Sequence, residues 1–341
     1  MKTKFVKLAI RILVTSGLLA WVLSQVDRQE LGQAIRAARP LDLAVLWATS
    51  LAFFILRSFK LRLILKQQAL DVPTLLLFKV SAINSLYSFV LPGFMSTGVK
   101  WYILKKATNK GTGVFNGMLY NQLSEVITMS ACALLTLIVA NPTPILWPET
   151  KHLWMLPTAC SILLVAVLAL PLLLLSRRTN RFIVAILEHM LRWLPARMRD
   201  KGLQALREAA AFQSVGWPFH IWMGLLTIVT HVGAAVVVYV LAARAAHFSV
   251  PPIVYVWLTS LIYILGRIPV TFANLGVREM ALVNILAVYG VEKSSALLMS
   301  MIIFSSMVVK AVLGAGFLIH WSLTGKNPER GAPSQADRTT S

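Results

Sequence analysis

Several charged residues lie in a stretch of the chain that is otherwise apolar. In GRIPVTFANLGVREM, residues 266–280, Arg267, Arg278 and Glu279 accompany Pro269. A charge at the depth of a bilayer costs on the order of 3 kcal/mol on insertion scales, and such charges mark substrate or ion pathways. A guanidinium binds phosphate oxygens bidentately. The stretch therefore predicts a site for a phosphate or another anionic head group.

A related pattern occurs earlier in the chain. LPGFMSTGVKWY, residues 91–102, and IPVTFANLGVREM, residues 268–280, share an aliphatic residue and a proline, then mostly small or apolar residues, then Gly-Val-Lys/Arg. Each copy falls at a break between an apolar run and a short helix. The predicted helix breaks are Pro92, Gly93 and Pro269.

The short helices are expected to begin near Gly98 and Gly276. The free N–H groups and the positive dipole end of a helix start favour an anion, and glycine lets a phosphate approach the backbone. The predicted substrate-binding residues are Gly98, Lys100, Arg267, Gly276 and Arg278. The alternative is structural, with Arg267, Arg278 and Glu279 forming an ion-pair lock within the bundle.

Two carboxylates are candidates for ion pairing or proton coupling. Glu125 lies in GMLYNQLSEVITM, about one helical turn after Asn121. It can pair with Lys100 or Arg278, or it can carry a proton that drives transport, as intramembrane carboxylates often do. Glu279 is expected to hold a neighbouring arginine when no substrate is bound.

The composition is that of an integral membrane protein. The 341-residue chain is 57% hydrophobic and 13% charged, with a mean hydropathy of +0.71. Apolar runs of roughly 17 to 25 residues, enough to cross about 30 Å of hydrocarbon, recur along it. The net charge of +20 falls in short loops between these runs. This placement is typical of membrane topology and argues against a nucleic-acid-binding function.

Apolar length predicts spans at 8–26, 41–59, 74–91, 114–140, 153–175, 217–241, 251–268 and 295–323, with short helices at 94–107 and 276–290. Basic residues mark the cytoplasmic side of the first two spans, which gives a cytoplasmic N-terminus. Those residues are Lys2, Lys4 and Lys7 before the first span, and Arg57, Lys60, Arg62 and Lys66 after the second.

The basic loops all fall on the cytoplasmic side only if two elements turn back within the membrane. The segments 74–91 and 94–107 form one re-entrant hairpin, and 251–268 with 276–290 form another that opens to the opposite side. The predicted fold class is therefore an all-α, polytopic membrane bundle of about eight spans with two broken elements in an inverted repeat. Carriers have this architecture, and their substrates bind near the midplane.

The domain organisation is one transmembrane domain, residues 1–325, followed by a disordered cytoplasmic tail, 326–341. Within the domain, residues 175–214 are expected to form a basic, amphipathic cytoplasmic linker.

The sequence contains no Ser-His-Asp arrangement, HExxH, P-loop or paired acidic metal motif, so no catalytic residue, metal or cofactor is predicted. His231 lies mid-span and is interpreted as a hydrogen-bonded core histidine. Cys132 and Cys160 are interpreted as small core residues.

Over roughly residues 1–325, the chain resembles the flippase-like family typified by the transmembrane domain of lysylphosphatidylglycerol synthases. IPVTFANLGVRE is similar to the family's proline-then-Gly-x-Gly-Val-Arg-Glu segment, LRSFKLRLIL to its basic stretch after the second span, and NSLYSFVLPGFMSTGVKWYILKK to its Asn…Pro…Gly…Arg segment. The chain departs from the pattern at Asn274 and Val99, where the family has glycine and an acid, and at Asn121-Gln122, where it has Asp-Arg.

The resemblance implies translocation of an anionic or head-group-modified lipid between the leaflets of a bacterial-type inner membrane, for example a glycosylated polyprenyl phosphate. The family's lipid-aminoacylating members carry a soluble catalytic domain after the membrane part, and this chain ends about 18 residues past its last span. A transporter is therefore expected rather than an enzyme, with a separate lipid-modifying enzyme as a partner.

Two alternatives stay open. One is a membrane-embedded transferase, or an accessory subunit of an envelope-lipid biosynthetic enzyme, with Glu125 or Glu279 as general base. The other is a scaffold without transport, in which the deep charges tolerate neutral replacement.

Overall fold

The computed structural model describes residues 39–91, 93–146, 149, 152–175, 215–266 and 276–324, and the regular elements within these ranges are all helices. The predicted all-α fold class is confirmed. The first predicted span, the linker beyond residue 175 and the tail lie outside the described residues, as do Pro92, Arg267 and Pro269.

Four helices are long and apolar enough to cross a membrane: α3 (Pro40–Lys66), α6 (Gly111–Ala140), the helix Trp217–Ala245, and α15 (Lys293–Thr324). The chain is therefore a multi-pass membrane protein. The shorter helices are α4 (Thr74–Val90), α5 (Gly93–Thr108), α7 (Thr143–Leu146), α8 (Met155–Leu175), α13 (Pro252–Leu265) and α14 (Val277–Val288). The number of about eight spans and the inverted repeat stay predictions.

Helical structure is interrupted at the two places where the repeated pattern occurs. α4 ends at Val90 and α5 begins at Gly93, while α13 ends at Leu265 and α14 begins only at Val277. With 14 and 12 residues, α13 and α14 are about 21 and 18 Å long, too short to cross about 30 Å of hydrocarbon alone.

The two breaks differ in where the following helix starts. Gly276 is the N-cap of α14 and has φ 87°, a left-handed conformation that glycine adopts without steric cost. α14 thus begins beside Gly276, as expected. α5 begins at Gly93, so Gly98 lies in its second turn. The expectation of a helix start near Gly98 is wrong, because the helix forms as soon as the chain has passed Pro92.

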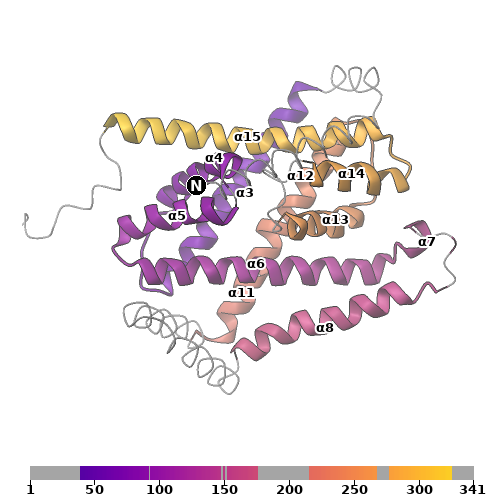
Figure 1. Ribbon diagram of the computed structural model, residues 1–341, viewed down its shortest axis with the longest axis horizontal. Coiled ribbons are helices and arrows are strands. Elements are labelled where there is room, and N and C mark those ends of the chain that lie inside the picture. Colours follow the sequence, from indigo (N-terminus) through magenta and orange to yellow (C-terminus); the bar gives the residue numbers. More distant parts are fainter. Residues whose placement is uncertain are drawn as a thin grey trace, which may run out of the picture.

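Two long helices, α15 and α6, lie on either side of the two broken helix pairs. In Figure 1, α15 and α6 run across the view, with α4 and α5 toward the left end and α13 and α14 toward the right. α15 packs against α4 and α14, and α6 packs against α5 and α13. Each broken pair is therefore positioned by the same two long helices.

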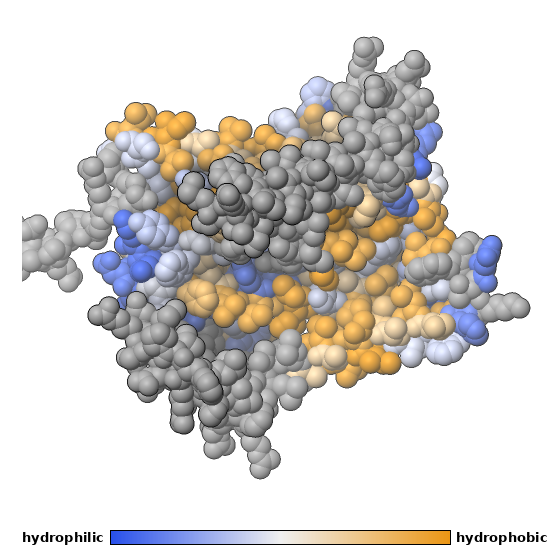
Figure 2. All heavy atoms as spheres, viewed as in Figure 1, coloured by the Kyte–Doolittle hydropathy of each residue, from blue (hydrophilic) through white to orange (hydrophobic). Residues whose placement is uncertain are grey.

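Apolar side chains cover much of the visible middle of the molecule, and hydrophilic ones gather toward the left and right ends (Figure 2). Val139, Val165 and Val312 are exposed side chains of α6, α8 and α15. Such surfaces are stable in hydrocarbon, where exposure of an apolar side chain carries no penalty.

The helix Trp217–Ala245 contains a local irregularity. It consists of α11 (Trp217–Thr227), the π-helical segment η1 (Ile228–Gly233) and α12 (Ala234–Ala245). A π-helical turn disturbs the regular backbone hydrogen bonding, and such turns often lie at functional sites. The side chains of Thr230 and His231 in this segment are buried.

α15 and α4 approach each other closely at a glycine. A Cβ atom placed on Gly314 would lie 2.1 Å from the carbonyl oxygen of Ala82, whereas one on Gly316 would meet nothing within 4 Å. The hydrogen-only side chain of Gly314 thus permits the contact between these two helices.

We expect Gly314→Ala to lower the thermal stability of the detergent-purified protein, because the added methyl must push α15 away from α4 at a cost of about 1–3 kcal/mol. Gly316→Ala on the same helix is the matched control, and its higher helix propensity should leave stability unchanged or raised by up to about 1 kcal/mol. Tryptophan fluorescence during heating measures both. Equal melting temperatures for the two variants would contradict the close packing.

Candidate functional site

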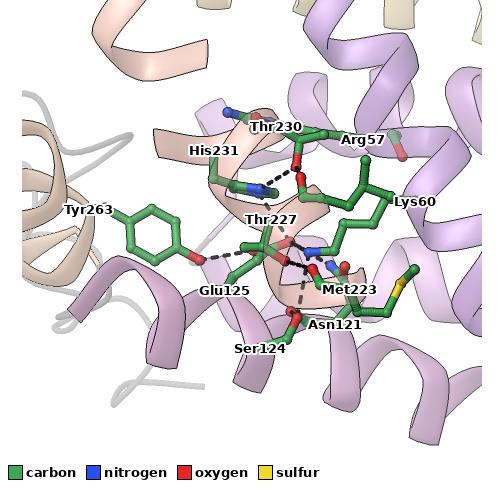
Figure 3. A network of polar contacts seen from close by, with 12 residues as sticks. Arg57, Lys60, Asn121, Ser124, Glu125, Met223, Thr227, Thr230, His231 and Tyr263 are labelled. Atoms are coloured by element: carbon green, nitrogen blue, oxygen red, sulfur yellow. Dashed lines mark hydrogen bonds and ion pairs between the residues drawn. The ribbon is translucent and has the colours of Figure 1, made fainter. Parts of the chain in front are cut away.

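Glu125 lies at the centre of a polar network inside the bundle (Figure 3). Its Oε1 accepts hydrogen bonds from Asn121 Nδ2 at 2.6 Å and lies 3.1 Å from His231 Nε2. Its Oε2 accepts a bond from the Tyr263 hydroxyl at 2.9 Å. Side chains from α6, η1 and α13 thus converge on one buried carboxylate. His231 is hydrogen-bonded in the core, as its sequence context suggested.

Lys60 approaches the same carboxylate from α3. Its Nζ lies 3.9 Å from Glu125 Oε1 and donates to Ser124 Oγ at 3.5 Å, and its side chain is fully buried. The sequence analysis placed Lys60 in a basic stretch after the second span, whereas Lys60 lies buried within α3. α3 continues to Lys66, because the apolar pattern that buries Leu61 extends beyond the predicted end of the span.

Glu125 was expected to pair with Lys100 or Arg278. Those cations bond elsewhere, Lys100 Nζ to Ser81 Oγ at 2.9 Å and Arg278 to Glu279. The pairing of Glu125 with a cation was anticipated, but the cation comes from α3.

Arg57 connects α3 to the π-helical segment. Its Nε donates to the backbone carbonyl of Thr230 at 2.8 Å. Arg57 lies one helical turn before Lys60, so the two cations lie on the same side of α3. The sequence analysis had also placed Arg57 in the basic stretch after the second span, and its position inside α3, where it lines both cavities described below, is a second correction with the same cause.

Two cavities meet at this network. The larger, of about 400 Å³, is lined by Arg278 of α14 and Lys310 of α15. The smaller, of about 240 Å³, is lined by Lys100 of α5. Arg57 and Glu125 line both cavities. Lys100 and Arg278, the cations of the two copies of the repeated sequence pattern, therefore line different cavities that share a wall.

Arg278 is buried and fully engaged. It forms an ion pair with Glu279 and donates through Nε to Ser300 Oγ at 3.0 Å. Its guanidinium carbon lies 5.5 Å from the centre of the Phe304 ring, a cation–π distance. Arg278 is thus held rigidly, whether it contacts a ligand or only locks the bundle.

Glu279 also caps α14. Its Oε2 accepts the Gly276 N–H at 2.6 Å, and its Oε1 accepts the Ser300 hydroxyl at 2.9 Å. The backbone group that was predicted to receive an anion is therefore occupied by the protein's own carboxylate. An incoming anion at this helix start would have to displace Glu279.

Polar groups line the smaller cavity around Lys100. The Oδ1 atom of Asn84 is buried there and has no hydrogen-bond partner among the residues that the structure describes. A buried acceptor without a partner is costly, so a donor from a bound molecule would stabilise it. Gly98, on the same helix as Lys100, is exposed and has open space at its Cβ position.

Positive charge exceeds negative charge inside the described bundle. The inward cations are Arg57, Lys60, Lys100, Arg278 and Lys310, and the buried carboxylates among the described residues are Glu125 and Glu279. Sequence reasoning missed Lys310, although its position in the middle of the last predicted span is itself the signal of a deep cation. It also missed Tyr263, which no motif distinguishes.

Comparison with known proteins gives one match. The family model described as the lysylphosphatidylglycerol synthase TM region matches residues 8–314. No curated protein and no solved structure matches the chain.

We expect Glu279→Gln to destabilise the protein strongly, because it leaves the Arg278 charge buried without a counter-ion, at a cost of about 3–5 kcal/mol. Glutamine retains an acceptor for the Gly276 N–H, so the loss reports the charge pair. Adding Arg278→Met should recover much of the stability. Thermal unfolding of the single and double variants measures the coupling.

The exposed pair Arg62–Asp71, with an N–O distance of 3.2 Å, provides the control. Asp71→Asn there should change stability by only about 0–1 kcal/mol, because solvent screens the pair. A Glu279→Gln variant as stable as Asp71→Asn would show that the buried pair does not support the fold.

Proposed function

Because the chain belongs to the family of the lysylphosphatidylglycerol synthase TM region, we propose that it moves an anionic or head-group-modified envelope lipid between the leaflets of a bacterial-type inner membrane. The family ties the chain to envelope lipids. The site supports transport in particular.

The observation that carries the proposal is the pair of cavities with a common wall. Lys100 lines one cavity and Arg278 the other, and Arg57 with Glu125 separates them. A head group that enters one cavity meets a cation there, and it reaches the second cation only by passing the wall. This arrangement is that of a carrier whose substrate site lies between two halves.

Passage would require the wall to open. The bonds that close it include Arg57 to the Thr230 carbonyl and Tyr263 to Glu125, which join α3 to η1 and α13 to α6. Each is a non-covalent contact of a few kcal/mol at most. A head group that offers its own acceptor to Arg57 replaces the first bond, so binding and opening are coupled. The acyl chains remain in the bilayer.

A transferase, or an accessory subunit of an envelope-lipid enzyme, is the second candidate. A general base needs an oxygen that can reach the proton of a substrate. Glu125 accepts bonds from Asn121 and Tyr263 through its two oxygens, and Glu279 accepts bonds from Ser300 and Gly276. Both carboxylates are engaged in holding the protein together, which supports transport over proton abstraction.

In the proposed topology the N-terminus is cytoplasmic and the two broken pairs open toward opposite sides of the membrane. Arg267 belongs to the proposed anion site with Arg278, and a lipid-modifying enzyme supplies the substrate. The position of Lys105 and Lys106 in the last turn of α5 fits a cytoplasmic end of that helix.

We expect Lys100→Gln, and Arg278→Gln combined with Glu279→Gln so that no unpaired charge is left buried, to slow lipid transfer at least about ten-fold, because each variant loses a charge-assisted contact of about 1.5–3 kcal/mol. Purified protein is reconstituted into vesicles with an acyl-labelled fluorescent phosphatidylglycerol or phosphatidic acid. Dithionite then quenches only the label in the outer leaflet, so transfer appears as loss of the protected fraction. Lys79→Gln is the matched control, since Lys79 lines neither cavity.

Wild-type rates in both variants would remove these cations from the mechanism. Vesicles with the wild-type protein that retain as much protected label as empty vesicles, for every anionic lipid tested, would contradict transport. Formation of a new lipid product by the purified protein alone would favour the transferase.

A second expectation concerns access to the two cavities from water. In a background with Cys132 and Cys160 replaced by serine, Ser85→Cys reports the smaller cavity and Ala235→Cys the larger. A membrane-impermeant maleimide should label the two cysteines preferentially from opposite faces of the membrane. Val165→Cys, on an exposed apolar surface of α8, should resist labelling from both. Labelling of both cavity cysteines from one face only would contradict the proposal that the two broken pairs open toward opposite sides of the membrane.

A further inference from the structure

Two cations of the larger cavity have no carboxylate partner. Arg57 and Lys310 both line it, and among the described residues no carboxylate lies within ion-pair distance of either. Arg57 donates to a backbone carbonyl, and Lys310 Nζ lies 5.8 Å from the centre of the Phe54 ring. Neither contact neutralises a charge.

The two cations line the same cavity. Phe54, which Lys310 overlies, is one helical turn before Arg57 on α3, so both side chains lie along the same stretch of that helix. Both are cationic side chains of one cavity, so they repel each other when both are charged. Two like charges in a medium of low dielectric constant repel strongly, so this pair of side chains favours an anionic occupant of the cavity.

The other charges of the cavity are already balanced. Glu279 neutralises Arg278, and Glu125 is held by Lys60 and His231. Among the described residues two positive charges of this cavity therefore remain without a carboxylate partner, and an occupant that brings two negative charges would balance them. The cavity, at about 400 Å³, is within the range of about 300–1,000 Å³ typical of small-molecule sites.

We propose that the larger cavity binds a dianionic phosphate monoester, held between Arg57 and Lys310. A phosphate monoester carries a charge of about −1.5 to −2 at pH 7, whereas a phosphate diester carries about −1. A head group that ends in an ammonium, as in an aminoacyl ester, meets two cations and is disfavoured. The inference rests on the proposed lipid-transport function for its biological role, but the binding itself can be tested without transport.

The experiment uses the full-length protein in nanodiscs of a zwitterionic lipid. Binding is followed by intrinsic tryptophan fluorescence during titration with four probes: a polyprenyl monophosphate, phosphatidic acid, phosphatidylglycerol and inorganic phosphate. The first two are lipid monoesters, the third is a diester, and the last is the free ion. We expect the two lipid monoesters to bind at least ten-fold more tightly than phosphatidylglycerol.

The variants Arg57→Gln and Lys310→Met should each weaken monoester binding at least ten-fold and bring its affinity close to that of the diester. Lys79→Met is the matched control. Lys79 also lies in a helix over an aromatic ring, 5.7 Å from the centre of Phe317, but outside the cavity. Its variant should bind as the wild type does. A second measurement, the thermal shift on addition of each probe, shows whether every variant is folded.

The outcomes separate this inference from the proposed function. Equal affinity for diester and monoester, or unchanged binding in both cavity variants, overturns the dianion site even if phosphatidylglycerol is transported. Monoester selectivity without any lipid transfer supports the site and overturns the transport proposal. Tight binding of inorganic phosphate that both variants abolish supports the dianion site and identifies a soluble phosphate as its source.

Discussion

The low dielectric constant of the bundle interior dominates this structure, because an uncompensated charge there is costly. Glu125 forms an ion pair with Lys60, and Arg278 forms one with Glu279. The Lys60–Glu125 pair joins α3 to α6, and the hydrogen bonds of Ser300 with Arg278 and Glu279 join α15 to α14, so these contacts fix how the helices face one another. Breaking either pair would leave a charge whose burial costs several kcal/mol. The polar network is therefore a geometric constraint on the fold as well as a candidate site.

The helical framework positions that network with few elements. α6 and α15 span the molecule, and each packs against one helix of both broken pairs (Figure 1). The close contact at Gly314 brings α4 against α15, and the π-helical segment presents the Thr230 carbonyl to Arg57. The site thus lies where regular helical geometry is interrupted. Interruptions at membrane depth are tolerated where protein or a polar cavity surrounds them.

Apolar length and proline position were sufficient to predict most helices and both breaks. They were insufficient for α3, whose helix runs to Lys66 rather than ending near residue 59. Basic residues after an apolar run normally mark the end of a span, and here Arg57 and Lys60 turn inward instead. The partners of Glu125 also could not be inferred, because His231 and Tyr263 are more than a hundred residues away in sequence. Local patterns predict helices, whereas such pairings depend on how the helices pack.

The double role of Glu279 has a kinetic consequence. This carboxylate already occupies the Gly276 N–H and the Arg278 guanidinium, the groups that an anionic head group would seek at the start of α14. In a transport cycle Glu279 would act as a resident competitor: it would return to these donors as cargo leaves, which lowers the net affinity and speeds dissociation. A carrier transports quickly only when it releases its substrate quickly. Competition by Glu279 for the same donors would therefore raise the transport rate at the expense of binding affinity.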